Sequence, residues 1–205
     1  MKEKISYMSD KFEQAGFTFS DLQKRQFYTF YNMLIDKNKV MNLTGITEFT
    51  EVVEKHFLDS IYLNHVTDLD QPVKIIDLGT GAGFPGIPLK IAFPEIEITL
   101  VDSLNKRIHF IEEVIEELRL TSIYAVHARA EELARRKEHR EMYDLCVSRA
   151  VANLTVLSEY CLPFIKVGGY LLAYKGPEGE RETEEAAKAI DLLGGKVEKI
   201  ENMKL

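Results

Sequence analysis

The stretch Asp77-Leu-Gly-Thr-Gly-Ala-Gly-Phe-Pro-Gly86 decides the fold, because it joins a short apolar run to a helical segment through alternating glycines. The run before it, 73–78, has the pattern of a buried strand, and a helix is expected at 86–92. Ligands of open α/β sheets bind at the carboxyl ends of the strands, where glycine lets the backbone approach them closely. Three alternating glycines exceed what a tight turn needs, so the stretch predicts a ligand-binding loop.

Outward from this loop, strand-like runs alternate with helical segments to the end of the chain. Strands are expected at 97–102, 122–127, 143–148 and 169–174, and helices at 105–118, 130–140, 153–165 and 179–193. A sixth strand is expected within 196–205, after the Gly194-Gly195 turn. Strands that alternate with helices form a mostly parallel sheet with helices on both faces. The sequence therefore predicts an α/β fold.

The first 66 residues have helical patterns only. Ser20-Asp-Leu-Gln23 has the form of a capping box, and it precedes an apolar face with helical spacing that includes Phe27 and Phe30. Further helices are expected at 2–15 and 48–64. These faces are too apolar to remain in water. We therefore expect a helical region, 1–66, packed on a ligand-binding domain, 67–205.

Composition limits the class of protein without identifying its partner. The 205 residues carry 26 Lys and Arg against 33 Asp and Glu, a net charge of −7, yet basic residues group locally, so charge does not decide for or against nucleic acid. No apolar run approaches the roughly 20 residues of a membrane helix. Cys146 and Cys161 are too few for a zinc site or a disulfide framework. We expect a cytoplasmic protein with two buried thiols, no metal and no membrane contact.

Two nucleoside cofactors fit the glycine-rich loop. Asp77-x-Gly79-x-Gly81-x-Gly83 matches the signature of methyltransferases that bind S-adenosylmethionine, whereas Gly81-x-Gly83-x-x-Gly86 matches the dinucleotide pattern. Asp102, at the end of the next strand, can accept hydrogen bonds from both ribose hydroxyls of either cofactor.

The loop itself favours the methyl donor. A pyrophosphate needs free N–H groups at the start of a helix, but Pro85 and Pro88 each remove one. Phe84, a bulky side chain beside the glycines, suits a thioether chain and an amino-acid group better than two phosphates. A dinucleotide stays open as the alternative.

Five motifs are spread over essentially the whole chain. They are Asn38-Lys-x-Met41-Asn-Leu-Thr44, His56-Phe-Leu-Asp-Ser60, Asp77–Leu89, Val101-Asp-Ser-x-x-Lys-Arg107 and Ser148-Arg-Ala-Val151. Together they resemble the glucose-inhibited division protein B family (ribosomal RNA small-subunit methyltransferase G). The resemblance implies a Rossmann-like class I S-adenosylmethionine-dependent methyltransferase that forms 7-methylguanosine in 16S ribosomal RNA of the bacterial small subunit and releases S-adenosylhomocysteine.

The resemblance also assigns site residues. It places Gly79, Phe84, Ala130, Glu131 and Arg149 in the donor-binding set. Members usually continue with a further strand and a basic tail, so we expect a chain truncated at its carboxyl end.

Several of these side chains have plainer interpretations. Arg149, at the end of the fourth strand, either ties a loop or orients guanine O6, an RNA phosphate or the donor's carboxylate. Ala130 and Glu131 also read as an ordinary helix start. His56 lies on an apolar helical face and is expected to be a core histidine.

Asn42, Lys106 and Arg107 are the candidates for contacting RNA. Asn42 is otherwise a turn former, and the two basic residues otherwise lie on a solvated helix face.

Guanine N7 carries an unprotonated lone pair, so its methylation needs no general base, and the sequence offers no obvious one.

Two other functions stay open. One is an NAD-dependent oxidoreductase with the same sheet topology, and the other is a non-catalytic ribosome-assembly factor. We expect a monomer that binds 16S ribosomal RNA or the small ribosomal subunit.

Overall fold

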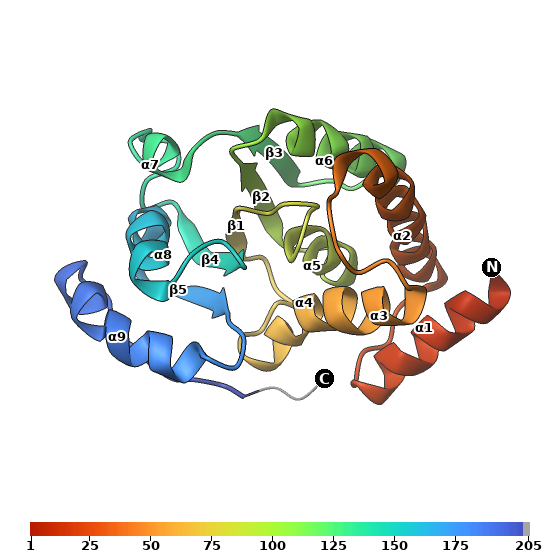
Figure 1. Cartoon of the computed structure of the whole chain (residues 1–205), viewed down its shortest axis with the longest axis horizontal. Coiled ribbons are helices and arrows are strands. Elements are labelled where there is room, and N and C mark those ends of the chain that lie inside the picture. Colours follow the sequence, from red (N-terminus) through yellow and green to blue (C-terminus); the bar gives the residue numbers. More distant parts are fainter. Residues whose placement is uncertain (203–205) are drawn as a thin grey trace.

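A parallel sheet forms the centre of the protein (Figure 1). The computed structural model describes residues 1–202, and within them five strands pair in the order β3-β2-β1-β4-β5, all parallel. The strands are β1 (Lys74–Leu78), β2 (Glu97–Asp102), β3 (Ile123–His127), β4 (Tyr143–Arg149) and β5 (Ile165–Tyr174). The α/β fold with a parallel sheet is thus confirmed.

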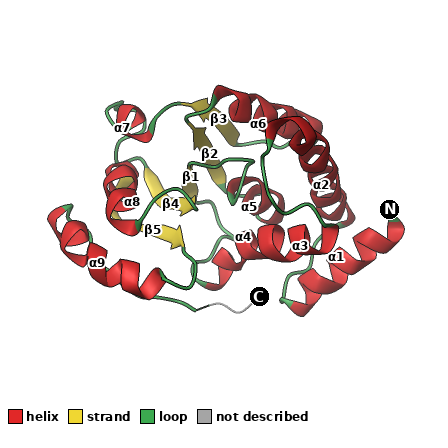
Figure 2. Ribbon diagram, viewed as in Figure 1, coloured by secondary structure: helices red, strands yellow, loops and turns green. Residues whose placement is uncertain are grey.

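Helices cover both faces of the sheet (Figure 2). Because side chains alternate along a strand, Ile75 and Ile98 face one layer while Ile76 and Val101 face the other. The first layer contains α5 (Gly86–Ala92) and α6 (Asn105–Glu117), together with the N-terminal helices. The second contains α7 (Ala130–Leu133), α8 (Leu154–Cys161) and α9 (Gly179–Leu192).

The N-terminal helices begin with α1 (Lys2–Gln14) and α2 (Asp21–Met41). The capping box at the start of α2 is confirmed, since the Ser20 hydroxyl accepts from Gln23 N–H and Gln23 Oε1 accepts from Ser20 N–H. A third helical segment runs from α3 (Phe49–Val52) through a π-helical turn, Val53–Leu58, into α4 (Asp59–Ile61) and a short 3-10 turn. Single π-helical turns of this kind often occur at functional sites.

These helices pack on α5 and α6, the helices that cover the same face of the sheet. The Gln23 Nε2 atom donates to the carbonyls of Ile91 and Ala92, at 2.9 and 3.0 Å, at the carboxyl end of α5. Gln26 donates in the same way to Leu118 O at 2.9 Å. Buried aromatic side chains of both regions share one core cluster, so the contact is apolar as well as polar. The domain boundary at residue 66 stays a prediction.

Three expected elements differ from the structure. Residues 196–202 form no strand, and 203–205 lie outside the described residues, so the sixth strand is wrong over its described part. This segment alternates charged side chains with a few half-exposed apolar ones, and its Lys and Glu residues pair with one another rather than with a core.

The helix expected at 130–140 ends at Leu133, because the charged residues that follow have no apolar face to bury. Strand β5 begins at Ile165, four residues before the expected start, where it pairs with Tyr143.

Among residues 1–202, no helix has both the length and the hydrophobicity needed to cross a membrane.

We expect Gly86→Ala to destabilise the protein. A Cβ atom at this position would lie 2.8 Å from Asp77 Oδ2 and still closer to the Leu100 side chain, both in the buried interior. Overpacking of this kind costs about 1–3 kcal/mol, more than the gain in helix propensity. Urea denaturation measures the difference, with Gly45→Ala as the control because a Cβ there meets nothing within 4 Å. Equal stability of the two variants would contradict this packing.

Candidate cofactor and substrate site

The glycine-rich loop lies against the end of β2. The N–H groups of Gly79 and Thr80 both donate to Val101 O, at 2.9 and 3.1 Å. Gly79 has φ +72°, and a Cβ atom there would collide with the Val151 side chain, so the position requires glycine on both counts. The absence of a side chain at Gly79 therefore leaves room for the Val151 side chain, through which the loop after β4 packs on the loop after β1.

Asp102 holds this loop in place. Its side chain is 3% exposed; Oδ2 accepts from Gly81 N–H at 3.0 Å and from Arg107 Nη1 at 3.2 Å, while Oδ1 accepts from Leu104 N–H at 2.9 Å. A carboxylate has about four acceptor positions, so these three bonds leave one. To bind both ribose hydroxyls, as expected from the sequence, Asp102 must release Arg107.

A pocket of about 230 Å³ opens beside Asp102 at the carboxyl edge of the sheet. It brings together four residues singled out in the sequence, Gly79, Asp102, Ala130 and Glu131. The pocket is also lined by residues that the sequence did not single out: Leu78, Val101, Ser103, Ala128, Arg129, Val151, Leu157 and Tyr160. Apolar walls with a buried carboxylate at one side fit a nucleoside, whose base is flat and whose sugar carries hydroxyls.

The start of α5 offers no free N–H group to a ligand. Gly86 N–H donates to Asp77 Oδ2 at 3.0 Å, Ile87 N–H donates to Gly83 O at 2.8 Å, and residue 88 is proline. A pyrophosphate bound in the dinucleotide manner needs such groups. The loop therefore fits the methyl donor and not a dinucleotide.

Asp77 lies beneath the loop and does not line the pocket. Burial raises its pKa to about 7. Its Oδ1 atom and the Thr80 hydroxyl are both buried without a hydrogen-bond partner among the described residues. Its observed contact, from Gly86 N–H, fixes the first turn of α5.

Arg149 and Phe84 lie apart from the pocket lining, on the side of the N-terminal helices. The Arg149 Nη1 atom donates to Asp59 Oδ2 at 2.7 Å and to Lys55 O at 3.3 Å. Its guanidinium carbon lies 5.0 Å from the centre of the Phe84 ring. The donor-binding set expected from the sequence is thus divided between two neighbouring places.

His56 joins these groups. Its Nδ1 atom lies 3.2 Å from Arg149 Nη2, and its Nε2 atom lies 2.8 Å from the Thr44 hydroxyl. A guanidinium only donates, so Nδ1 must accept and Nε2 must carry the proton. The ring also stacks on Phe84, with centroids 4.5 Å apart. Burial, followed by the Arg149 charge, lowers the pKa of His56 to about 4.

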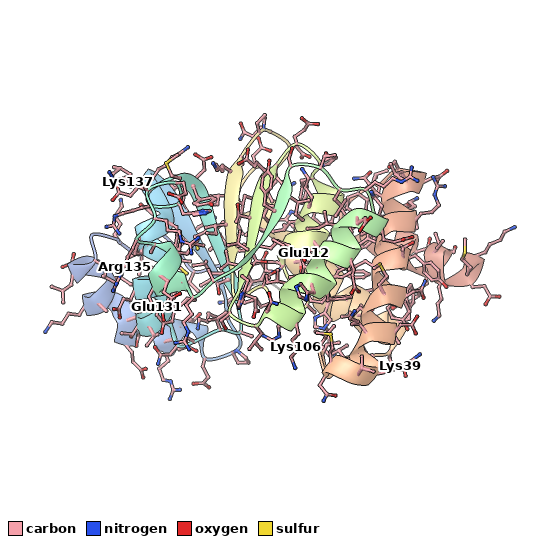
Figure 3. The ribbon with its side chains drawn as sticks, turned by 90° about the horizontal axis from the view of Figure 1, so that it is seen from above. Lys39, Lys106, Glu112, Glu131, Arg135 and Lys137 are labelled. Carbon is pink, nitrogen blue, oxygen red and sulfur yellow. The ribbon has the colours of Figure 1, made fainter. Side chains whose placement is uncertain are left out.

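The three candidates for RNA contact differ in whether their side chains already contact other residues of the protein. Asn42 is exposed and ends α2 with φ +50°. Lys106 is exposed at the start of α6, and within residues 1–202 it makes no ion pair, whereas Arg107 is engaged by Asp102. Figure 3 shows Lys106 and Lys39 along one edge of the molecule and Lys137 at the opposite edge.

Sequence reasoning did not single out Asp59 or Thr44, although both fall in quoted motifs. The signal was the i, i+3 spacing of His56 and Asp59, which places two possible partners for Arg149 on one side of a helix. In the described part of the chain, no three His, Cys, Asp or Glu side chains gather closely enough to hold a metal ion.

Comparisons with known proteins identify the family of this chain. The model of a protein family described as rRNA small subunit methyltransferase G (GidB) matches residues 23–205. Proteins named ribosomal RNA small subunit methyltransferase G, from Alkaliphilus metalliredigens and Desulforamulus reducens, are each 50% identical to this chain. The matches cover 93% and 94% of this chain and 80% of each relative.

A solved structure shows the same fold. It is an S-adenosylmethionine-dependent methyltransferase from Aquifex aeolicus, with a TM-score of 0.54 and 17% identity, covering 78% of this chain and 87% of that chain. This likeness confirms the class I methyltransferase fold.

We expect the His56 side chain to stay neutral at pH values well below 6.5, the usual pKa of histidine. The unfolded chain protonates this histidine near 6.5 and the folded chain near 4, so the unfolded state binds more protons between these values. The stability that His56 contributes is therefore complete above pH 6.5 and is lost as the pH falls towards 4. Buried Asp77 shifts stability in the opposite direction, so wild type is compared with His56→Gln. Ring-proton NMR gives the midpoint directly, and a midpoint near 6.5 would refute the burial of this ring.

Proposed function

Because the chain belongs to the ribosomal RNA small subunit methyltransferase G family, we propose that it methylates N7 of a guanine in 16S ribosomal RNA. S-adenosylmethionine is the methyl donor, and S-adenosylhomocysteine is the product. The observation that carries the proposal is the pocket at the carboxyl edge of the sheet, which adjoins a glycine-rich loop followed by a helix whose first turn has no free N–H group for a pyrophosphate.

Each part of the donor has its own set of residues in this proposal. We propose that Asp102 holds the ribose, that Gly79 and Gly81 allow close approach of the loop, and that Ala130 and Glu131 border the base. Asp77 and Gly83 support the loop from beneath through the α5 turn. Bound S-adenosylmethionine supplies a methyl group already activated on a sulfonium, so the chain has to align donor and acceptor.

The acceptor atom is the one that the family resemblance implies, and the residues near the site are compatible with it. N7 of guanine attacks without losing a proton, so its methylation needs no general base. Methylation of a pyrimidine carbon needs a cysteine nucleophile, but Cys146 is fully buried and burial raises its pKa well above the usual value. Arg149 is then an orienting group: its free N–H groups suit O6, a phosphate or the donor's carboxylate, with N7 left open to attack.

We propose that the RNA lies along the edge of the molecule that carries Lys106. Exposed basic side chains such as Lys106 can bind phosphates, with Asn42 as a further contact and Arg107 available once it leaves Asp102. The partner is 16S ribosomal RNA or the small subunit, which places the protein in the cytoplasm, and we propose that it acts as a monomer. The comparisons give no support to an oxidoreductase or to a non-catalytic assembly factor.

The proposal is tested by incubating the purified chain with S-adenosylmethionine labelled in the methyl group and with small ribosomal subunits or protein-free 16S RNA. The labelled methyl group should be transferred to the RNA of at least one of these two substrates. Calorimetry on the same sample should show binding of S-adenosylhomocysteine and none of NAD. Binding of NAD alone would favour the oxidoreductase.

We expect Asp102→Ala to weaken binding of the donor by about 1–3 kcal/mol, because the ribose loses a charged acceptor in a nearly buried place. Calorimetry with S-adenosylhomocysteine measures the change. Asp144→Ala is the matched control: its carboxylate also accepts from a backbone N–H, that of Lys74, but at the opposite end of the strands. If both variants bind the ligand as wild type does, Asp102 is not a ribose ligand.

Arg149→Ala should reduce methyl transfer by about 100-fold or more, because a misplacement of about 1 Å can cost that much. The affinity for S-adenosylhomocysteine and the melting temperature are measured beside the rate, with Arg181→Ala, on the exposed face of α9, as the control. A normal rate of methyl transfer by folded Arg149→Ala would show that Arg149 is not part of the site.

A further inference from the structure

We propose that Asp59 and His56 are positioning residues that hold the Arg149 guanidinium against Phe84, so that its remaining N–H groups face the methyl acceptor. The inference rests on the proposed function, because it concerns how Arg149 orients the acceptor. It assigns a role in the reaction to the π-helical turn and to the start of α4, which otherwise serve only as part of the N-terminal helices.

The contacts of Arg149 divide its donors into two groups. Of its five N–H groups, both on Nη1 are used by Asp59 Oδ2 and Lys55 O, and one on Nη2 is used by His56 Nδ1. The other Nη2 N–H and the Nε N–H have no partner among the described residues. The side chain is 17% exposed, so these two donors are oriented by the protein while part of the guanidinium remains open to a ligand.

The groups that hold Arg149 are themselves held. His56 is fixed by stacking on Phe84 and by the hydroxyl of Thr44. Thr44 is fixed in turn by Asn38, whose side chain accepts from Thr44 N–H at 2.9 Å and donates to Thr44 O at 3.0 Å. This succession of bonds leads from α2 to the end of β4. It gives the guanidinium one orientation rather than a range of rotamers.

The ion pair is not needed to dock the helices. The N-terminal region is already attached by Gln23, Gln26 and a continuous aromatic core. Asp59 is 30% exposed, and partly exposed ion pairs contribute little to stability. A bond that adds little stability but fixes two free donors beside the glycine-rich loop is better explained by positioning than by folding.

The test uses the full chain and Asp59→Asn, which keeps the shape and removes the charge. We expect the rate of methyl transfer at saturating donor and RNA to fall about 10-fold or more, while the Kd for S-adenosylhomocysteine changes less than about twofold and the melting temperature is retained. In an Arg149→Ala background, the same substitution should have no further effect, because Asp59 acts through Arg149. Asp144→Asn, which loses an ion pair with Lys166 at the opposite end of the strands, is the control and should leave the rate unchanged.

A wild-type rate in Asp59→Asn, or the same fold-loss with and without Arg149, would overturn the inference. If Asp59→Asn does not fold, His56→Gln provides the same double-mutant comparison.

A second readout does not depend on activity. In ¹⁵N-labelled protein, the Arg149 Nη signals should be separate in wild type and should merge in Asp59→Asn as the guanidinium begins to rotate. Merged signals in wild type would contradict the positioning role, even if the RNA is methylated. Separate signals in a protein that transfers no methyl group would leave the contact intact and refute the proposed function instead.

Discussion

The site depends on side chains that pack closely against glycine backbone at the loop after β1. At Gly79 a Cβ atom would meet the Val151 side chain from the loop after β4, and at Gly86 it would meet the Leu100 and Asp77 side chains. A side chain at Gly86 would have to displace buried groups beside α5, and one at Gly79 would have to displace Val151 and adopt an unfavourable positive φ. The carboxylates of Asp77 and Asp102 reinforce this packing, because each accepts a hydrogen bond from an N–H group of this loop or of the turn that follows it.

Around this loop, two groups of residues come from different parts of the chain. The pocket beside Asp102 is lined by residues after 77, whereas the groups that hold Arg149 come from the helical segment after α2. We propose that the first group serves the donor and the second the acceptor. On this proposal, the packing of the N-terminal helices on α5 matters for the reaction because it sets the distance between the two groups.

Much of this organisation could be predicted from the sequence, because period-2 and period-3.6 patterns and glycine spacing are local signals. The parallel sheet, the Ser20 capping box and the placing of Gly79 and Asp102 at one edge of the sheet followed from them, whereas Ala130 and Glu131 were assigned to the site only by the family resemblance. The partners of Arg149 did not, since they depend on how a helix 90 residues earlier packs. The prediction of a sixth strand was wrong over its described residues for a related reason: a segment forms a strand only where a neighbouring strand and a core accept it, and Val197 and Ile200 remain exposed.

The most direct test of the central claim is nucleoside mass spectrometry of 16S ribosomal RNA after incubation of small subunits or protein-free RNA with the purified chain and S-adenosylmethionine. The RNA must come from cells that lack this methyltransferase. We predict that 7-methylguanosine increases with the wild-type chain and increases more slowly with Asp102→Ala at a donor concentration near the wild-type Kd. Methylation of another atom, or no gain of methylated nucleoside from either substrate, would contradict the account.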